Sequence, residues 1–251
     1  MGKYSGLLIC ADFDGTLVYN GQISPGNLDA IRRFQQGGGW LTLATGRYPN
    51  VLRDHGVAFR CNAPLICMNG AILYDEETEK ALYEGFIEES CEELLLDAIR
   101  RCQEVRELVF CMAEGRRAQH VSPSDIPLIR ELCGKPLYKI LIHVSARQGV
   151  TLRDYLREKS EGRYLVDRSW HSGVEIQGIG YDKGKTARRL ANMLDADSLL
   201  CIGDFDNDLS MIREADVGYA MGNATEELKA AADRITASVE EDGFAQMIDE
   251  L

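Results

Sequence analysis

The sequence has no apolar run that approaches the roughly 18–20 residues needed to cross a bilayer. It also has no C-x-x-C pair: the eight cysteines are spread singly along 251 residues, which argues against a zinc site. The first residues, Met1-Gly2-Lys3-Tyr4-Ser5, lead into a short apolar run, without the apolar core of a signal peptide. We therefore expect a cytoplasmic protein with no membrane partner, whose cysteines are buried thiols and not disulfides.

The chain has fewer basic residues than acidic ones. The chain has 28 lysines and arginines against 40 aspartates and glutamates, a formal net charge of −12. This charge disfavours nucleic acid or an anionic membrane as the main partner. A few basic side chains can still bind a phosphate locally, and the length is enough for one large domain or two modest ones.

Short apolar runs alternate with segments of helical period, which predicts an α/β fold with a Rossmann-like, mostly parallel sheet. The expected strands are Leu7–Ala11, Leu41–Ala44, Leu65–Met68, Leu199–Ile202 and Val217–Met221. Between the first two strands, Ser24-Pro25 is typical of a helix start, and Gly37-Gly38-Gly39 of a helix stop.

The middle of the chain has a different character, with polar segments that favour antiparallel pairing. We predict an inserted α+β cap domain at residues 81–179, and a catalytic core formed by residues 1–80 and 180–251. The expected pairs are Leu108–Met112 with Arg117–Val121, and Arg163–Val166 with Gly173–Ile176. The expected helices lie near Cys91–Cys102, Ser124–Cys133 and Gly149–Lys159.

Polar residues follow each predicted core strand. The strand ends carry Asp12-Phe13-Asp14-Gly15-Thr16, Thr45-Gly46-Arg47, Asn69-Gly70, Gly203-Asp204-Phe205-Asp206-Asn207-Asp208 and Gly222-Asn223. The carboxyl ends of parallel strands share one edge of a sheet, where ligands bind. Any one of these segments is also common in ordinary turns, but together they predict one crevice lined with carboxylates, amides and a hydroxyl.

This set of groups suits phosphoryl transfer. Asp12, Asp204 and Asp208 would repel one another unless a hard cation lay among them, and oxygen ligands favour Mg²⁺. The same cation would keep Asp12 ionised as a nucleophile. Asp14 is placed to act as general acid and then general base.

The transferring phosphoryl group also needs donors and a positive charge. The hydroxyl of Thr45 and backbone N–H groups of the Phe13–Gly15 turn could donate hydrogen bonds to its oxygens. Lys183 is the preferred cation, because helical geometry turns its rival Lys185 to another face. The segment around Lys183 does not match a nucleotide P-loop.

Four of these segments, in this order, resemble the motifs of the haloacid dehalogenase superfamily: Asp12–Thr16, Thr45–Arg47, Lys183-Gly184 and Gly203–Asp208. Three further segments narrow the resemblance to the Cof-type hydrolases: Asn69-Gly70-Ala71, Val174-Glu175-Ile176 and Met221–Ala224.

The resemblance implies that Asp12 is the nucleophile, Asp14 the acid and base, and Lys183 a catalytic cation. It implies that Thr45 contacts the phosphate and that Asn207 lies near it. Gly46 and Arg47, in the same turn as Thr45, are further candidates for phosphate binding, although Arg47 could instead bridge core and cap. It implies Mg²⁺ bound by Asp12, the backbone carbonyl of Asp14, and Asp204, with Asp208 close or acting through water.

The expected function is Mg²⁺-dependent hydrolysis of a small phosphorylated metabolite, such as a sugar phosphate. A phosphomutase with the same nucleophile and a non-catalytic phosphate-binding regulator are the alternatives, and a dehalogenase has no use for Asp14 or the metal cluster. No pattern indicates an oligomeric state. Cap residues that could contact substrate lie at Glu114–Arg117, His120 and Arg168–His171, whereas His55 and His143 are expected to be structural.

Overall fold

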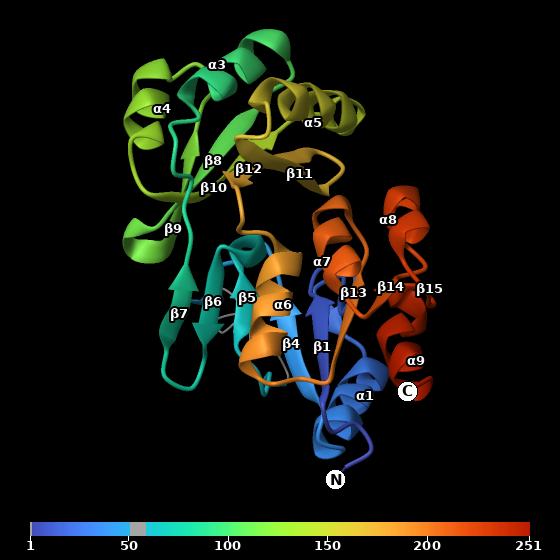
Figure 1. Cartoon of the computed structure of the whole chain (residues 1–251). Helices are drawn as coiled ribbons and strands as arrows, with labels where there is room; N and C mark the ends of the chain where they lie inside the picture. The colour runs from blue at the N-terminus through green and yellow to red at the C-terminus, as the bar shows by residue number, and fades with distance from the viewer. Residues whose placement is uncertain (1, 51–58) are drawn as a thin grey trace. The chain divides into compact units, whose positions relative to one another are not determined.

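The computed structural model describes residues 2–50 and 59–251, and the chain divides into two compact units (Figure 1). The first, here called the core unit, contains residues 1–84 and 182–251. The second, the inserted unit, contains residues 85–181. His55, predicted to be structural, lies outside the described residues.

The core unit is built on an eight-stranded sheet in the order β15-β14-β13-β1-β4-β5-β6-β7. Its strands are β1 (Leu7–Asp12), β4 (Trp40–Ala44), β5 (Leu65–Cys67), β6 (Ile72–Asp75), β7 (Lys80–Glu84), β13 (Ser198–Gly203), β14 (Val217–Ala220) and β15 (Arg234–Ile235). The strands from β15 to β5 run parallel to their neighbours. All five predicted core strands are present, and the α/β fold class is confirmed.

Among residues 2–50 and 59–251, the helices of the core unit pack against one another and against the sheet. They are α1 (Pro25–Gln36), α6 (Lys183–Met193), α7 (Leu209–Glu214), α8 (Glu226–Ala231) and α9 (Gly243–Asp249). In α1, Oγ of Ser24 accepts the N–H of Asn27 at 3.0 Å, so the predicted cap is confirmed. Figure 1 shows α6 and α7 in front of the sheet, and they pack against each other.

The edge of this sheet departs from the parallel pattern. β6 pairs antiparallel with β5, and β7 pairs antiparallel with β6, so the sheet continues past residue 80 as far as Glu84. A short hairpin, β2 (Val18–Tyr19) with β3 (Gln22–Ile23), follows β1. The polar composition from about residue 76 therefore belongs to an exposed edge strand of the core unit, whose outward side chains face water.

The inserted unit is an antiparallel sheet with helices over it. Its strands, in the order β11-β12-β10-β8-β9, are β11 (Tyr164–Trp170), β12 (Gly173–Gly178), β10 (Leu137–His143), β8 (Glu107–Met112) and β9 (Arg117–Val121). Its helices are α3 (Glu92–Arg101), α4 (Ile126–Cys133) and α5 (Ala146–Ser160). Both predicted strand pairs and all three predicted helices are confirmed.

The centre of the inserted unit is β10. Its residues are buried almost throughout, and Ile140 and Ile142 join Phe110, Leu156 and Ile176 in the apolar core. The sequence pattern predicts a strand around His143 but not that it is the middle of the sheet. A strand buried on both faces loses the alternation that marks a half-exposed one.

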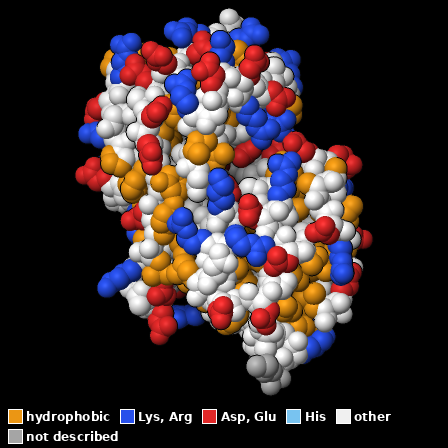
Figure 2. All heavy atoms as spheres, in the orientation of Figure 1, with side chains coloured by type: hydrophobic (Ala, Val, Ile, Leu, Met, Phe, Trp, Pro, Cys, Tyr) orange, Lys and Arg blue, Asp and Glu red, His pale blue; other side chains and the backbone are white. Residues whose placement is uncertain are grey.

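Two expectations from composition can be compared with the structure. All eight cysteines lie within the described residues and are free thiols. Among residues 2–50 and 59–251, no helix has the length and apolar character needed to span a membrane. Figure 2 shows basic side chains interspersed with acidic ones on the face in view.

Candidate active site

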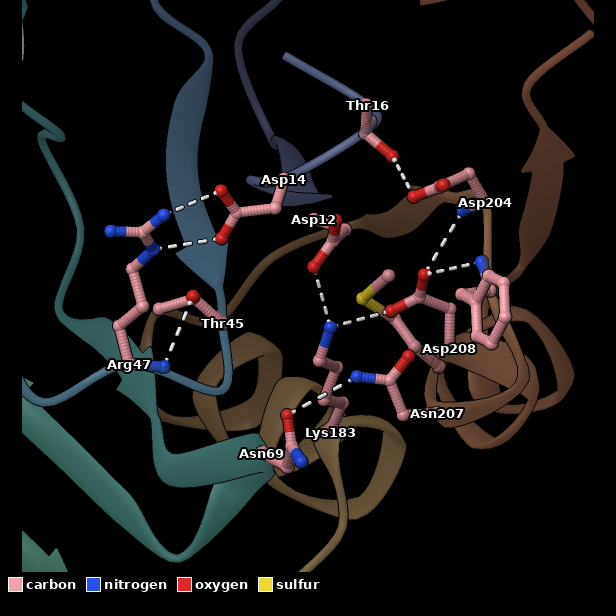
Figure 3. Close-up of polar contacts among 12 residues, drawn as sticks. Asp12, Asp14, Thr16, Thr45, Arg47, Asn69, Lys183, Asp204, Asn207 and Asp208 are labelled. Carbon is pink, nitrogen blue, oxygen red and sulfur yellow. Dashed lines mark hydrogen bonds and ion pairs between the residues drawn. The ribbon is translucent and has the colours of Figure 1, made fainter. Parts of the chain in front are cut away.

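The site lies at the carboxyl ends of the central strands. β1 pairs in parallel register with β13 on one side and with β4 on the other, so Asp12 and Asp204 lie at the ends of neighbouring strands. Chain order along the sheet reverses between β1 and β13, and ligands of open α/β sheets bind at such a reversal. The predicted convergence of strand ends at this edge is confirmed for the core unit (Figure 3).

A buried lysine connects two of the carboxylates. Nζ of Lys183 lies 2.6 Å from Oδ1 of Asp12 and 2.6 Å from Oδ1 of Asp208, and its side chain is fully buried. Burial opposes its charge, but the two carboxylates outweigh burial and raise the pKa of Lys183 above its ordinary value. Lys185 is exposed and its Nζ lies 3.8 Å from Asp182, so Lys183 is the lysine that reaches the site.

Lys183 owes its position to the start of α6. The side chain of Asp182 caps this helix by accepting the N–H of Lys185 at 2.8 Å. Lys183 is thus the first residue of the helix, at the end nearest the strand termini.

Three carboxylates form a tight cluster. One oxygen each from Asp12, Asp204 and Asp208 can be chosen so that all lie within 4.8 Å of one another. Burial raises the pKa of Asp12 well above its usual value, and Asp208 and Asp204 raise it further against the opposing charge of Lys183. Burial and the neighbouring Asp208 raise the pKa of Asp204 to about 7. Lys183 therefore offsets only part of the repulsion, and the oxygen-only donor set fits a hard divalent cation.

Asp208 has a second role in the loop after β13. Its Oδ2 accepts the backbone N–H of Asp204 at 3.0 Å and of Phe205 at 3.1 Å. With Oδ1 on Lys183, three hydrogen bonds already occupy this carboxylate, which has about four acceptor positions. Asp208 is therefore better placed to shape the loop and hold Lys183 than to act as a full metal ligand.

Contacts from two other segments hold Asp204. Thr16 donates from Oγ1 to Oδ1 of Asp204 at 3.1 Å, and Nδ2 of Asn223 lies 3.5 Å from Oδ2. Asn223 also donates to the carbonyl of Gly15 at 2.9 Å. A side chain at Gly15 would bring its Cβ to 2.4 Å from Oδ2 of Asp204, so glycine is required for this close approach.

Asp14 is paired with Arg47. Nε and Nη2 of Arg47 donate to the two carboxylate oxygens of Asp14 at 2.8 Å and 2.7 Å, and both side chains are partly exposed. Figure 3 shows the Asp14 carboxylate turned toward Arg47. The sequence contains no pattern that predicts this pair, because the two residues follow different strands.

The prediction that the Phe13–Gly15 turn offers its backbone N–H groups to the phosphoryl oxygens is wrong for Gly15. The backbone N–H of Gly15 donates to the carbonyl of Val18 at 3.0 Å, as part of the turn into the β2–β3 hairpin. It is therefore engaged within the turn and not directed to a ligand.

The turn after β4 carries Thr45, Gly46 and Arg47. Thr45 is buried, and its Oγ1 accepts the backbone N–H of Arg47 at 3.2 Å, which leaves the hydroxyl proton for another acceptor. Asn207, on the loop after β13, donates from Nδ2 to Oδ1 of Asn69 at 3.3 Å. The sequence marks Asn69 as a strand end and as part of the Cof-type resemblance, but its contact with Asn207 emerges only from the structure.

The residues predicted for substrate contact in the inserted unit are not brought together. Glu114–Arg116 and His120 lie beside β8 and on β9, at one edge of the sheet, whereas Trp170 ends β11 at the other edge. His120 Nδ1 lies 3.0 Å from a Glu107 carboxylate oxygen. The Trp170 ring packs edge-on against His143, whose predicted structural role this contact supports.

Residues 9–248 match the family described as haloacid dehalogenase-like hydrolase. The chain therefore belongs to the haloacid dehalogenase superfamily. Within it, this protein is a Cof-type hydrolase, as its motifs indicate.

Similar proteins align over nearly the whole chain. A 5-amino-6-(5-phospho-D-ribitylamino)uracil phosphatase, YitU of Bacillus subtilis, is 26% identical over 97% of this chain and 96% of its own. The pyridoxal phosphate phosphatase YbhA of Escherichia coli is 25% identical over 96% of this chain and 97% of its own. A haloacid dehalogenase-like hydrolase from Bacteroides thetaiotaomicron has a solved structure with 27% identity and a TM-score of 0.72, covering 99% of each chain.

Proposed function

We propose that this protein is a Mg²⁺-dependent phosphatase that hydrolyses a small phosphorylated metabolite through an aspartyl-phosphate on Asp12. The observation that carries the proposal is the buried carboxylate of Asp12, held by Lys183 beside Asp204 and Asp208 at the sheet's carboxyl edge. The enzyme class is phosphoric monoester hydrolase, in keeping with the named phosphatases among its relatives. This arrangement, and not any single motif, supports phosphoryl transfer.

The residues present fit a magnesium ion. Asp12 and Asp204 would be its carboxylate ligands, with the backbone carbonyl of Asp14, and with Asp208 close by or acting through water. When bound, Mg²⁺ would neutralise part of the charge on the cluster and on the phosphoryl oxygens. Burial, and then repulsion from Asp208, raise the pKa of Asp204 to about 7, and a bound cation would favour the ionised form against both.

In the first step, a carboxylate oxygen of Asp12 attacks phosphorus and the bond to the ester oxygen breaks. The leaving oxygen takes a proton from the carboxyl group of Asp14, so the alcohol departs neutral. Lys183, the hydroxyl of Thr45 and the amide of Asn207 stabilise the negative charge on the transferring phosphoryl oxygens.

In the second step, water attacks phosphorus and the bond to Asp12 breaks. Asp14, now a carboxylate, takes the proton from this water, and inorganic phosphate leaves. A carboxylate held by two guanidinium N–H groups is an acceptor only. Proton donation by Asp14 in the first step therefore requires Arg47 to separate from it, which would free Arg47 for an anionic substrate.

The substrates in the relatives' names support the proposed substrate class. YitU and YbhA are named for different molecules, and both names describe a phosphate on a small organic compound. We propose a substrate of that kind, a sugar phosphate or related monoester. The inserted unit is proposed as the cap that supplies substrate specificity, and a cytoplasmic location remains a prediction.

The decisive experiment is a phosphate-release screen against a panel of phosphorylated metabolites. We expect release from at least one compound with Mg²⁺, loss of release on chelation with EDTA, and recovery when Mg²⁺ is restored. Conversion of a sugar phosphate to its isomer without free phosphate would instead establish a mutase. Binding of phosphate compounds with no turnover across the panel would establish a regulator.

Replacing Asp14 with asparagine should slow both formation and hydrolysis of the phosphorylated intermediate. Loss of a positioned acid and base typically costs roughly 10²- to 10⁴-fold in rate. Rapid-quench measurements on Asp14→Asn would resolve the two phases. If both rates equal those of the wild type, Asp14 has no part in proton transfer.

A further inference from the structure

Three consecutive residues after β5 have left-handed backbone conformations. Met68 has φ 50°, Asn69 has φ 53° and Gly70 has φ 101°. This region disfavours L-residues, and a bulky side chain such as that of Met68 is rarely found there. Both Met68 and Asn69 are buried. A segment of this kind persists only where its surroundings fix it, and such segments concentrate at functional sites.

The backbone of this segment holds the turn after β4. The N–H of Asn69 donates to the carbonyl of Thr45 at 2.9 Å, and the N–H of Met68 donates to the carbonyl of Arg47 at 3.1 Å. An extended chain at residues 68–69 could not direct two successive N–H groups to a turn in this way. The left-handed conformation thus positions the two residues proposed to contact phosphate.

The same segment supports the start of α6. Oγ1 of Thr186 donates to the carbonyl of Gly70 at 2.8 Å. A Cβ atom at Gly70 would lie 2.2 Å from the backbone oxygen of Asp182, the residue before Lys183. Gly70 is therefore packed directly against the backbone that sets the position of the catalytic lysine.

The side chain of Asn69 makes the third connection. Its Oδ1 accepts Nδ2 of Asn207 at 3.3 Å, and Figure 3 shows the two amides directed toward each other below Lys183. Residues 68–70 therefore contact the three segments that carry Thr45, Lys183 and Asn207. An acceptor at Asn69 restricts the orientation of the Asn207 amide.

We propose that Asn69 is a positioning residue for phosphoryl transfer, which orients Asn207 through its side chain and the Thr45–Arg47 turn through its backbone. The inference rests on the proposed function, because it assigns Asn69 a part in the same reaction. Asn69 does not itself need to touch the substrate.

The test is the substitution Asn69→Gly. Glycine adopts φ near 53° more readily than asparagine, so the backbone hydrogen bonds to Thr45 and Arg47 should persist. The substitution removes the acceptor for Asn207 together with the rest of the buried Asn69 side chain. We expect kcat/KM to fall by roughly 10- to 100-fold, the range typical of a misplaced group near the reacting atoms. The backbone preference of glycine should offset part of the lost side-chain contacts, so we expect the Tm to change by only a few degrees.

Asn20→Gly is the matched control. Asn20 is also a left-handed asparagine, with φ 49°, but it is exposed in the turn between β2 and β3. The Asn20→Gly substitution brings the same backbone preference of glycine but removes no contact with Asn207. We expect its kcat/KM to match the wild type.

A double-mutant cycle with Asn207→Ala tests the route of the effect. If Asn69 acts through Asn207, the double variant should be about as active as Asn207→Ala alone. Multiplicative losses would overturn the proposal, as would an unchanged kcat/KM in Asn69→Gly. A fall in Tm that accounts for the loss of activity, and a recovery at lower temperature, would reduce Asn69 to a structural role.

A measurement of inorganic phosphate binding distinguishes failure of this inference from failure of the proposed function. Calorimetric titration of phosphate in the presence of Mg²⁺ should show weaker binding to Asn69→Gly than to the wild type and to Asn20→Gly. If the wild type releases phosphate in the screen but phosphate binding is equal in all three proteins, the inference fails alone. If the wild type releases none, the proposed function fails.

Discussion

Asp12→Asn is expected to reduce phosphate release to background, a loss of at least about 10⁴-fold, because no other group replaces a covalent nucleophile. The amide keeps the size of the side chain and cannot form the phosphoryl ester. Asparagine also removes one charge from the cluster with Asp204 and Asp208, so the fold should survive. Steady-state phosphate release and thermal unfolding would be measured on the same preparation.

A direct observation of the intermediate completes this test. Acid quenching of the wild type during turnover should trap a phosphoryl group on the peptide that contains Asp12, and mass spectrometry should find none in Asp12→Asn. Asp29 lies on the exposed surface of α1, so Asp29→Asn is the control for replacing a carboxylate with an amide. Appreciable Mg²⁺-dependent turnover by Asp12→Asn would exclude Asp12 as the nucleophile.

Lys183→Met is expected to cause the largest loss of stability. The variant leaves Asp12 and Asp208 buried without the cation that lies 2.6 Å from each. Breaking a buried ion pair by removing one partner costs roughly 3–5 kcal/mol. At about 2–4 °C per kcal/mol for a chain of this size, the Tm should fall by roughly 6–20 °C. Catalysis should be lost with it, because Lys183 also stabilises the phosphoryl oxygens.

The same variant should show a characteristic dependence on pH in metal-free buffer. Burial raises the pKa of Asp12 above its unfolded value, and Lys183 opposes that rise. A group with a raised folded pKa stabilises the fold at low pH and loses this contribution as the pH rises through the folded value. The Tm of Lys183→Met should therefore rise as the pH is lowered through the raised folded pKa of Asp12, by more than the Tm of the wild type does over the same range.

Lys185→Met is the control for that experiment. Lys185 is exposed and its Nζ lies 3.8 Å from Asp182, so its loss should change the Tm very little. An equal loss of stability in the two variants would show that the buried charges do not depend on Lys183.

Much of the core could be predicted from sequence because its signals are local. A buried apolar run such as Leu7–Ala11 predicts a strand, and Asp12, directly after it, is the residue at the end of that strand. Parallel pairing then places such ends on one edge without knowledge of the strand order. This is why the sequence alone groups Asp12, Asp204 and Asp208.

The contacts that the sequence does not predict are the ones that join distant segments. Arg47 meets Asp14, and Asn69 meets Asn207, through side chains on four different loops. No spacing rule connects these positions. The left-handed conformation of Met68 is equally hidden in the sequence, because it depends on the hydrogen bond from its N–H to Arg47 and not on local preference.

The pairing of β1 with β13 has a consequence for how the protein is made. One neighbour of β1, β4, is synthesised soon after it. The other neighbour, β13, emerges only after the whole inserted unit. Until then, one edge of the central strand stays open on the nascent chain, and such pairing across long separations is slow. The acidic cluster can consequently form only after β1, β4, β5, β6 and β7 have all been synthesised.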